Sequence, residues 1–292
     1  MAYRSLRRGQ LTRVQVHDAR TGTDIVILES AEILLEAPNW SLDGETLLLN
    51  GNGVLWSLAP REGASPEPVA HDGLPEINND HVLAPDGESI YLSAADGHIY
   101  RAAPSGGPVE KITPEDGLRH FLHGVSPDGQ RLAYVQLSGP GAPGVLMVLA
   151  ATGGEPTLVD TGVGHIDGPE WSPDGEWIYL NSEHWATEPG HAQICRIRED
   201  GSDLERLVES GTVDWFPHLS PDGSKAVYIE FPPGTQGHPA DLPVNLVLVD
   251  TKDWTTPLAR IPVPGGQGTI NVNSWSPDST RFGYVSYPIG DA

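Results

Sequence analysis

The chain has 292 residues, of which 34 are glycine and 27 are proline, and 38% hydrophobic residues are enough for a folded core. Its 17 basic and 40 acidic side chains give a net charge of −23, which disfavours contact with phosphate backbones and anionic lipid. We therefore expect neither a nucleic-acid partner nor a membrane partner.

The first residues, MAYRSLRRGQLTR, are basic but no apolar stretch follows them, so we expect no secretory signal. No apolar run of 18 residues predicts a membrane helix. The single Cys195 cannot form a disulfide within the chain, and its strand-like surroundings, QICRIR, predict a small buried side chain. These features together predict a cytoplasmic protein.

Two strands are predicted near the N-terminus, TRVQVHD from Thr12 and TDIVILE from Thr23. A turn motif then recurs six times, as WSLDG, LAPDG, VSPDG, WSPDG, LSPDG and WSPDS, beginning at residues 40, 83, 125, 171, 219 and 275. In the common form SPDG, Pro fixes φ, Asp caps the turn and Gly adopts a positive φ. Intervals of 42 to 56 residues are typical of a propeller blade with four short strands.

Each turn is followed by an alternating strand, such as ETLLLN from Glu45 or EWIYLNS from Glu176, and then by a third and a short fourth strand. The sixth unit contains only its first two strands, so we expect the N-terminal strands at 12–29 to complete the blade formed by 270–288. The chain is therefore predicted to be all-β, a single six-bladed β-propeller of four-stranded antiparallel blades over residues 1–292. Joining the two termini in one sheet would remove its open edges.

These units resemble the PD40 (WD40-like) repeats of TolB-like β-propellers. The best matches are WSPDGEWIYLNS from Trp171, with its continuation AQICRIREDGSDLERLV, and LSPDGSKAVYIE from Leu219. The resemblance covers nearly the whole chain and implies the propeller fold. TolB itself is periplasmic and has an α/β domain before its propeller, whereas we expect neither that domain nor a signal sequence here. Oligogalacturonate lyases have a similar architecture and use histidines around a divalent metal in the propeller funnel.

In a propeller the first strand of each blade runs along the axis, so all six SPDG turns are expected on one rim. The opposite rim collects the segments that lead into the first strands and the loops between second and third strands. Those loops are long in blade 4, SEHWATEPGHAQ from Ser182, and in blade 5, FPPGTQGHPADLP from Phe231. Eight of the eleven histidines fall in segments bound for this rim: His81, His120, His123, His165, His184, His191, His218 and His238.

This clustering predicts that the axial funnel binds a small polar ligand, such as a carbohydrate or a peptide. Side chains of Asn, Asp, His and Trp suit the hydroxyls and apolar ring face of a sugar, or the polar groups of a peptide. The predicted ligand-binding residues are Asn79, Asp80, His81, His123, Asp167, Glu170, Asp214, Trp215, His218, Gln236, His238, Asn271 and Asn273.

A second hypothesis is a metal-dependent, sugar-active enzyme of the lyase type. His81, His123 and His218 would hold a divalent ion such as Mn²⁺, Zn²⁺ or Ca²⁺. The metal would neutralise a substrate carboxylate and acidify the neighbouring proton, and His218 or His123 would remove that proton. Arg119 is the one arginine in the segments that lead into the first strands, and it could also compensate an anionic substrate.

A third hypothesis is a protein-interaction scaffold, in which a partner contacts the blade 4 and 5 loops around Trp185 and Phe216.

At some positions, packing alone could explain the residues that these three hypotheses use. His81, His123 and Asn273 share one repeat position, three residues before the Ser or Ala of the turn, which Pro38, Pro169 and Pro217 occupy in the other blades. Asp214 and Trp215 could simply begin a strand. The residues that we assign to structure alone are the core tryptophans Trp40, Trp171 and Trp275 and the turn-capping aspartates Asp86, Asp128, Asp174 and Asp222.

Overall fold

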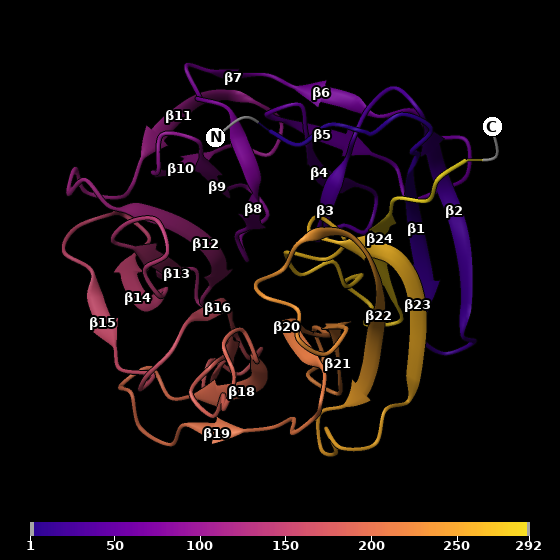
Figure 1. Ribbon diagram of the computed structural model, residues 1–292. Helices are drawn as coiled ribbons and strands as arrows, with labels where there is room; N and C mark the ends of the chain where they lie inside the picture. The colour runs from indigo at the N-terminus through magenta and orange to yellow at the C-terminus, as the bar shows by residue number, and fades with distance from the viewer. Residues whose placement is uncertain (1–2, 291–292) are drawn as a thin grey trace.

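A computed structural model describes residues 3–290, which form a ring of six β-sheets around a central axis (Figure 1). The predicted all-β, six-bladed propeller is thus confirmed. The predicted unit of 1–292 also includes residues 1, 2, 291 and 292, which lie outside the described residues. Within residues 3–290, no helix is long and apolar enough to span a membrane.

Blades 1, 3, 4 and 5 are four-stranded antiparallel sheets in which strands follow chain order from the axis outward. Blade 1 consists of β3 (Glu36–Trp40), β4 (Leu47–Gly51), β5 (Val54–Leu58) and β6 (Glu67–Val69), and blade 3 of β12 (Arg119–Val125), β13 (Arg131–Leu137), β14 (Val145–Ala150) and β15 (Thr157–Val159). Blade 4 consists of β16 (Ile166–Trp171), β17 (Ile178–Ser182), β18 (Gln193–Ile197) and β19 (Glu205–Arg206). Blade 5 consists of β20 (Val213–Leu219), β21 (Lys225–Phe231), β22 (Ala240–Asp250) and β23 (Ala259–Gly266). Blade 2 contains β8 (Ile77–Leu83), β9 (Ile90–Ala94), β10 (Ile99–Ala102) and β11 (Gly107–Lys111), and the short β7 (His71–Asp72) pairs in parallel with β11.

Blade 6 joins the two ends of the chain. Its regular strands are β24 (Arg281–Ser286), β1 (Thr12–Asp18) and β2 (Thr23–Ser30). β1 pairs antiparallel with β24, from Arg13 opposite Ser286 to Asp18 opposite Arg281. Figure 1 shows the indigo β1 and β2 beside the yellow C-terminal segment.

The axial position of blade 6 departs from a regular strand. Residues 269–275 lie beside β24 and pair with it irregularly. The Gly283 N–H donates to the Ser274 carbonyl at 2.9 Å, and Trp275 forms an isolated bridge with Phe282. Asparagine side chains compete with the sheet for backbone groups here. The Asn271 Oδ1 accepts from Gly268 N (2.7 Å), and the Asn273 Oδ1 accepts from Trp275 N (3.0 Å).

The SPDG motifs form the expected turns. In blade 4 the Asp174 Oδ1 accepts from Ser172 Oγ at 2.6 Å and from Glu176 N at 3.0 Å, and Gly175 has a φ of 73°. These bonds explain the recurrent aspartate without any role in chemistry.

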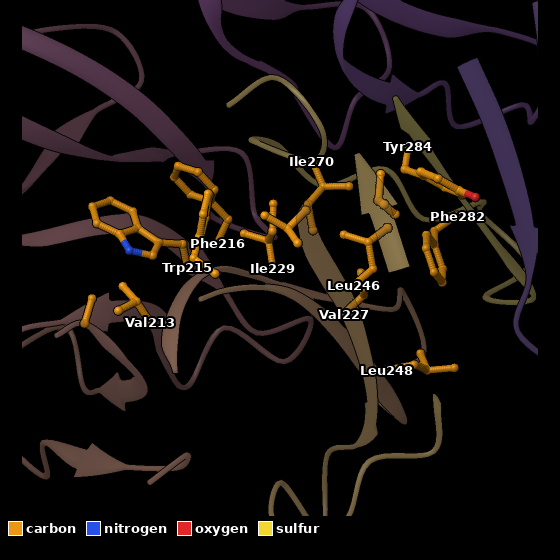
Figure 2. Packing of buried hydrophobic residues seen from close by; sticks show 14 of the residues in the cluster. Val213, Trp215, Phe216, Val227, Ile229, Leu246, Leu248, Ile270, Phe282 and Tyr284 are labelled. Carbon is orange, nitrogen blue, oxygen red and sulfur yellow. The ribbon is translucent and has the colours of Figure 1, made fainter. Parts of the chain in front are cut away.

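Hydrophobic side chains fill the space between neighbouring blades. Figure 2 shows Val227 and Leu246 of blade 5 lying toward Phe282 and Tyr284 of β24. The predicted core role of Trp40, Trp171 and Trp275 is confirmed, because each is at most 4% exposed. Cys195 is also fully buried, as expected.

Five axial strands contain a β-bulge at nearly the same repeat position. A bulge lets two residues oppose one on the neighbouring strand, which turns the local side chains to new directions. Ala37, Gly168 and Phe216 are equivalent bulge residues with φ between 52° and 62°. The bulges decide which side chains point into the centre of the ring.

Candidate functional site

A cavity of about 380 Å³ lies at the axis, lined by the N-terminal segment and by all blades except the sixth. None of its lining residues belongs to an SPDG turn, and those on axial strands precede the turn by at least three residues. Five predicted ligand-binding residues line this cavity: Asn79, Asp80, His123, Asp167 and His238.

β12 shows how the sequence aims side chains at the cavity. Successive residues of a strand point to opposite faces, and Arg119, Phe121 and His123 all line the cavity. The alternate residues point away. His120 packs edge-on against Tyr134 with ring centroids 5.4 Å apart, and Leu122 is fully buried in the core.

The buried centre of the site is an ion pair between His123 and Asp167. The His123 Nε2 lies 2.9 Å from the Asp167 Oδ1 and 3.9 Å from the Asp80 Oδ1. Burial alone would lower the pKa of His123, but the two carboxylates outweigh it and raise that pKa to about 9. Burial likewise opposes ionisation of Asp167, yet His123 holds the Asp167 pKa well below its usual value. The pair is therefore charged at neutral pH.

Two further imidazoles face the same carboxylate. The Nε2 atoms of His165 and His238 lie 3.8 and 3.6 Å from the Asp167 Oδ2. His238 comes from the long blade 5 loop, and its Nδ1 contacts the Gln267 Oε1. The imidazole rings of His165 and His238 both pack against Trp215, which Figure 2 shows beside Phe216. Burial lowers the pKa of His238, whereas for His165 the nearby Asp167 carboxylate outweighs burial and raises the pKa.

Asp80 and Asn79 supply polar groups that the protein satisfies only in part. The Asp80 side chain accepts one hydrogen bond, from Asn78 Nδ2 at 2.6 Å, although the residue is only 5% exposed. Burial raises the pKa of Asp80 to about 6; the nearby His123 opposes this rise and the Asp167 carboxylate adds to it. Within residues 3–290 the Asn79 side chain makes no hydrogen bond.

The N-terminal segment reaches the site, which no sequence pattern indicated. Arg4 donates to the Glu36 Oε1 at 3.1 Å and to the Asp241 Oδ1 at 2.7 Å, and its guanidinium lies 4.1 Å from the centroid of the Tyr287 ring. Burial raises the pKa of Glu36, and Arg4 opposes that rise. Arg4 thus holds Tyr3 and its neighbours against blades 1, 5 and 6 at the cavity. No local pattern around residue 4 signals such long-range pairing.

Three predicted residues form a closed network outside the cavity. The Glu170 carboxylate accepts from His218 Nδ1 (2.7 Å), from Leu219 N (2.9 Å) and from Asn273 Nδ2 (2.7 Å). The other ring nitrogen of His218 contacts the Ile270 carbonyl at 2.6 Å. Glu170, His218 and Asn273 therefore connect blades 4, 5 and 6 and have little capacity left for a ligand.

The other predicted residues also lie outside the cavity lining. Asp214 is fully buried between blades 4 and 5, where it accepts from Ser210 Oγ at 2.8 Å and from Thr212 Oγ1 at 3.0 Å, and burial raises its pKa to about 6. Trp215 is buried beneath His238. Asn271 binds the Gly268 backbone, and the exposed Gln236 packs near Gly190 of the blade 4 loop.

The predicted metal ligands are not assembled into one site. His81 is fully buried, its Nε2 contacts the Leu48 carbonyl at 3.4 Å, and burial lowers its pKa to about 4. Both nitrogens of His218 are engaged, and His123 pairs with Asp167. Across residues 3–290, no group of three or more His, Cys, Asp or Glu side chains is arranged to hold a metal ion. The predicted set of His81, His123 and His218 therefore does not fit a bound divalent metal.

The fold and the site together define a six-bladed β-propeller with an axial cavity. No family model matches the chain. Uncharacterized protein Atu1656 of Agrobacterium fabrum is 37% identical over 278 residues, which cover 94% of this chain and 92% of the relative. The solved structure of a "putative TolB" from Agrobacterium tumefaciens is 36% identical with a TM-score of 0.87, and the match covers 96% of this chain and 99% of that chain. The chain belongs to this TolB-like β-propeller family.

More distant structures share the fold alone. An oligogalacturonate lyase solved in complex with manganese has a TM-score of 0.55 at 17% identity, and the match covers 90% of this chain and 76% of that chain. The propeller architecture thus recurs in a lyase solved with a metal. The chemistry of such a protein depends on side chains that the fold does not fix.

Proposed function

We propose that this TolB-like propeller binds a small polar ligand, carbohydrate or peptide-like, in its axial cavity. The observation that carries the proposal is the mixture of apolar rings and incompletely satisfied polar groups around one hollow. Phe121 and Phe216 offer apolar surface, while Asn79 and Asp80 keep hydrogen-bonding capacity that the protein does not use. A volume of about 380 Å³ suits a small molecule.

The rigidity of the lining supports binding over mere packing. His123 stacks over Phe216 with ring centroids 5.7 Å apart, and its ion pair to Asp167 fixes its orientation. Phe216 is itself held at a bulge, where its backbone N–H donates to the Asn181 Oδ1 at 3.2 Å. Side chains that are already ordered lose little entropy when a ligand arrives.

The proposal is tested by filling the cavity. Ala95 lines it, whereas Ala150 is exposed beside the SPDG turn of blade 3, so Ala95→Trp and Ala150→Trp make a matched pair. A panel of monosaccharides, uronic acids, amino acids and dipeptides would be screened by thermal shift and then titrated calorimetrically. A ligand at 100 times its Kd should stabilise the fold by about 2.7 kcal/mol.

We expect at least one compound to bind the wild-type chain and Ala150→Trp but not Ala95→Trp. Failure of every compound to bind, or equal binding by the two tryptophan variants, would contradict the proposal. Melting curves without ligand would establish that both variants fold.

A further inference from the structure

Arg119 is a cation of the cavity lining for which residues 3–290 supply no ion-pair partner. Arg4 lies between Glu36 and Asp241, and His123 pairs with Asp167. In the described part of the chain Arg119 forms no ion pair, and its buried Nε has no hydrogen-bond partner. A guanidinium stays protonated at every physiological pH. This side chain therefore holds an unbalanced positive charge beside the hollow.

The position of Arg119 separates it from the acidic part of the lining. It is the first residue of β12, and His123 lies four residues further along the strand, on the order of 10 Å deeper along the axis. Phe121 lies between them, with the Arg119 guanidinium 5.5 Å from the centroid of its ring. The carboxylates of Asp80 and Asp167 gather near His123 instead. The cavity thus has Arg119 at one end, where the exposed Glu76 also lines it without forming an ion pair within residues 3–290, an apolar middle, and an inner end rich in acceptors.

We propose that the ligand of this cavity carries a carboxylate that binds Arg119 and directs its hydrogen-bond donors toward Asn79 and Asp80. The inference rests on the proposed function, and it names the chemical class of the ligand. Sugar acids and amino acids share this arrangement of one carboxylate with hydroxyl or ammonium donors.

Electrostatics favours this orientation over the reverse. A carboxylate at the inner end would meet a His123 that is already paired with Asp167, and it would face the like charge of Asp80, which repels it in a buried site. At Arg119 it would accept charge-assisted hydrogen bonds from a planar donor group. Such bonds contribute about 1.5–3 kcal/mol, which corresponds to roughly a tenfold to hundredfold gain in affinity.

The test compares acids with partners that lack only the carboxylate. D-glucuronate is paired with D-glucose, and L-phenylalanine with 2-phenylethylamine, in calorimetric titrations of four proteins. These are the wild-type chain, Arg119→Gln, Arg119→Lys and the control Arg101→Gln, which removes one positive charge from β10 outside the cavity.

In the wild-type chain and in Arg101→Gln, we expect the acid of one pair to bind at least about tenfold more tightly than its partner. Arg119→Gln should abolish this preference while the partner without the carboxylate keeps its affinity. Arg119→Lys should retain part of the preference, because it keeps the charge but loses the planar donor group. The pair that responds distinguishes a sugar acid from an amino acid.

Two results would overturn the inference. One is that the acid and the compound without the carboxylate bind equally well in the cavity, with both blocked by Ala95→Trp. This result would leave the proposed function intact. The other is an acid preference that Arg119→Gln leaves unchanged. If instead the wild-type chain binds none of these compounds in the cavity, both this inference and the proposed function are contradicted. Arg119→Lys is informative even if Arg119→Gln folds poorly.

Discussion

Asp167 and Glu170 are two buried carboxylates on the same strand, β16, and they have different surroundings. Glu170 accepts hydrogen bonds from three groups of blades 5 and 6, so protein donors satisfy it. Asp167 faces three imidazoles at 2.9, 3.8 and 3.6 Å and lines a cavity. The bulge between the two residues turns them toward different neighbours.

The comparison separates a structural carboxylate from one that belongs to a candidate site. Residue type and burial do not distinguish the two, since both are acidic and nearly inaccessible to solvent. What differs is how protein donors satisfy them. The Asp167 Oδ1 accepts from Gly168 N and pairs with His123, but within residues 3–290 the Asp167 Oδ2 accepts no hydrogen bond. Changes around Glu170 should therefore act on stability, and changes around Asp167 should act mainly on charge and on ligand binding.

The largest expected effect is loss of the Glu170 network. Glu170→Ala leaves His218 and Asn273 without their acceptor in a buried interface, so we expect a loss of about 3–5 kcal/mol in the free energy of unfolding. Urea denaturation measures it. Glu170→Gln keeps an acceptor and should lose less. Near-wild-type stability of Glu170→Ala would refute the structural role.

The His123–Asp167 pair should make stability depend on pH. The folded pKa of His123 is about 9, above its unfolded value, so the pair stabilises the fold fully below about pH 6.5 and this stabilisation is lost as pH rises through 9. His123→Gln should therefore lose roughly 3 kcal/mol relative to wild type at pH 6.5 and much less above pH 9. Chemical denaturation across that range measures the difference. A constant difference would argue against a charged pair.

Gly168 tests the bulge that separates the two carboxylates. Its φ is 62°, and an added Cβ would lie 2.9 Å from the Phe216 Cδ1. We expect Gly168→Ala to destabilise the fold by about 2 kcal/mol, through backbone strain and the clash together. Gly22→Ala is the matched control, because Gly22 has a φ of 70° with open space around it. Equal losses in thermal melts of the two variants would show that packing against Phe216 has no effect.

Of these variants, Asp80→Asn should destabilise the fold least. The folded pKa of Asp80 is about 6, above its unfolded value, so the wild-type fold loses stability as pH rises from 4 through 6. The asparagine cannot ionise, so its stability relative to wild type should rise over that interval, by up to about 3 kcal/mol for a pKa that moves from near 4 to about 6. Melting temperatures from pH 4 to pH 7.5 measure this trend. A falling relative stability would contradict the raised pKa.

The repeats made most of the fold predictable. Each SPDG turn is a local signal, because Pro, Asp and Gly act on their own backbone. The predicted first strand of blade 6 is irregular because Asn271 and Asn273 bind nearby backbone groups, a competition that the alternating pattern does not reveal. The cytoplasmic location stays a prediction.

Strand position accounts for most of the predicted residues that line the cavity, and the long blade 5 loop predicted His238 as well. Asn79, Asp80, His123 and Asp167 lie three to five residues before a turn and line the cavity. Glu170 and His218 occupy the next repeat position and face another blade instead, which depends on how the blades pack. The Arg4 contact depends on a residue far away in sequence, Asp241, so no local pattern could predict it.

The pairing of β1 with β24 has a consequence for biosynthesis. On the ribosome, β1 emerges more than 260 residues before the strand that becomes its inner neighbour. Until translation reaches residue 281, the nascent chain exposes an unpaired backbone edge that can associate with other chains. The sixth blade can therefore close only after residues 281–286 have been made, so products that terminate before these residues should be the species that aggregate and need chaperones.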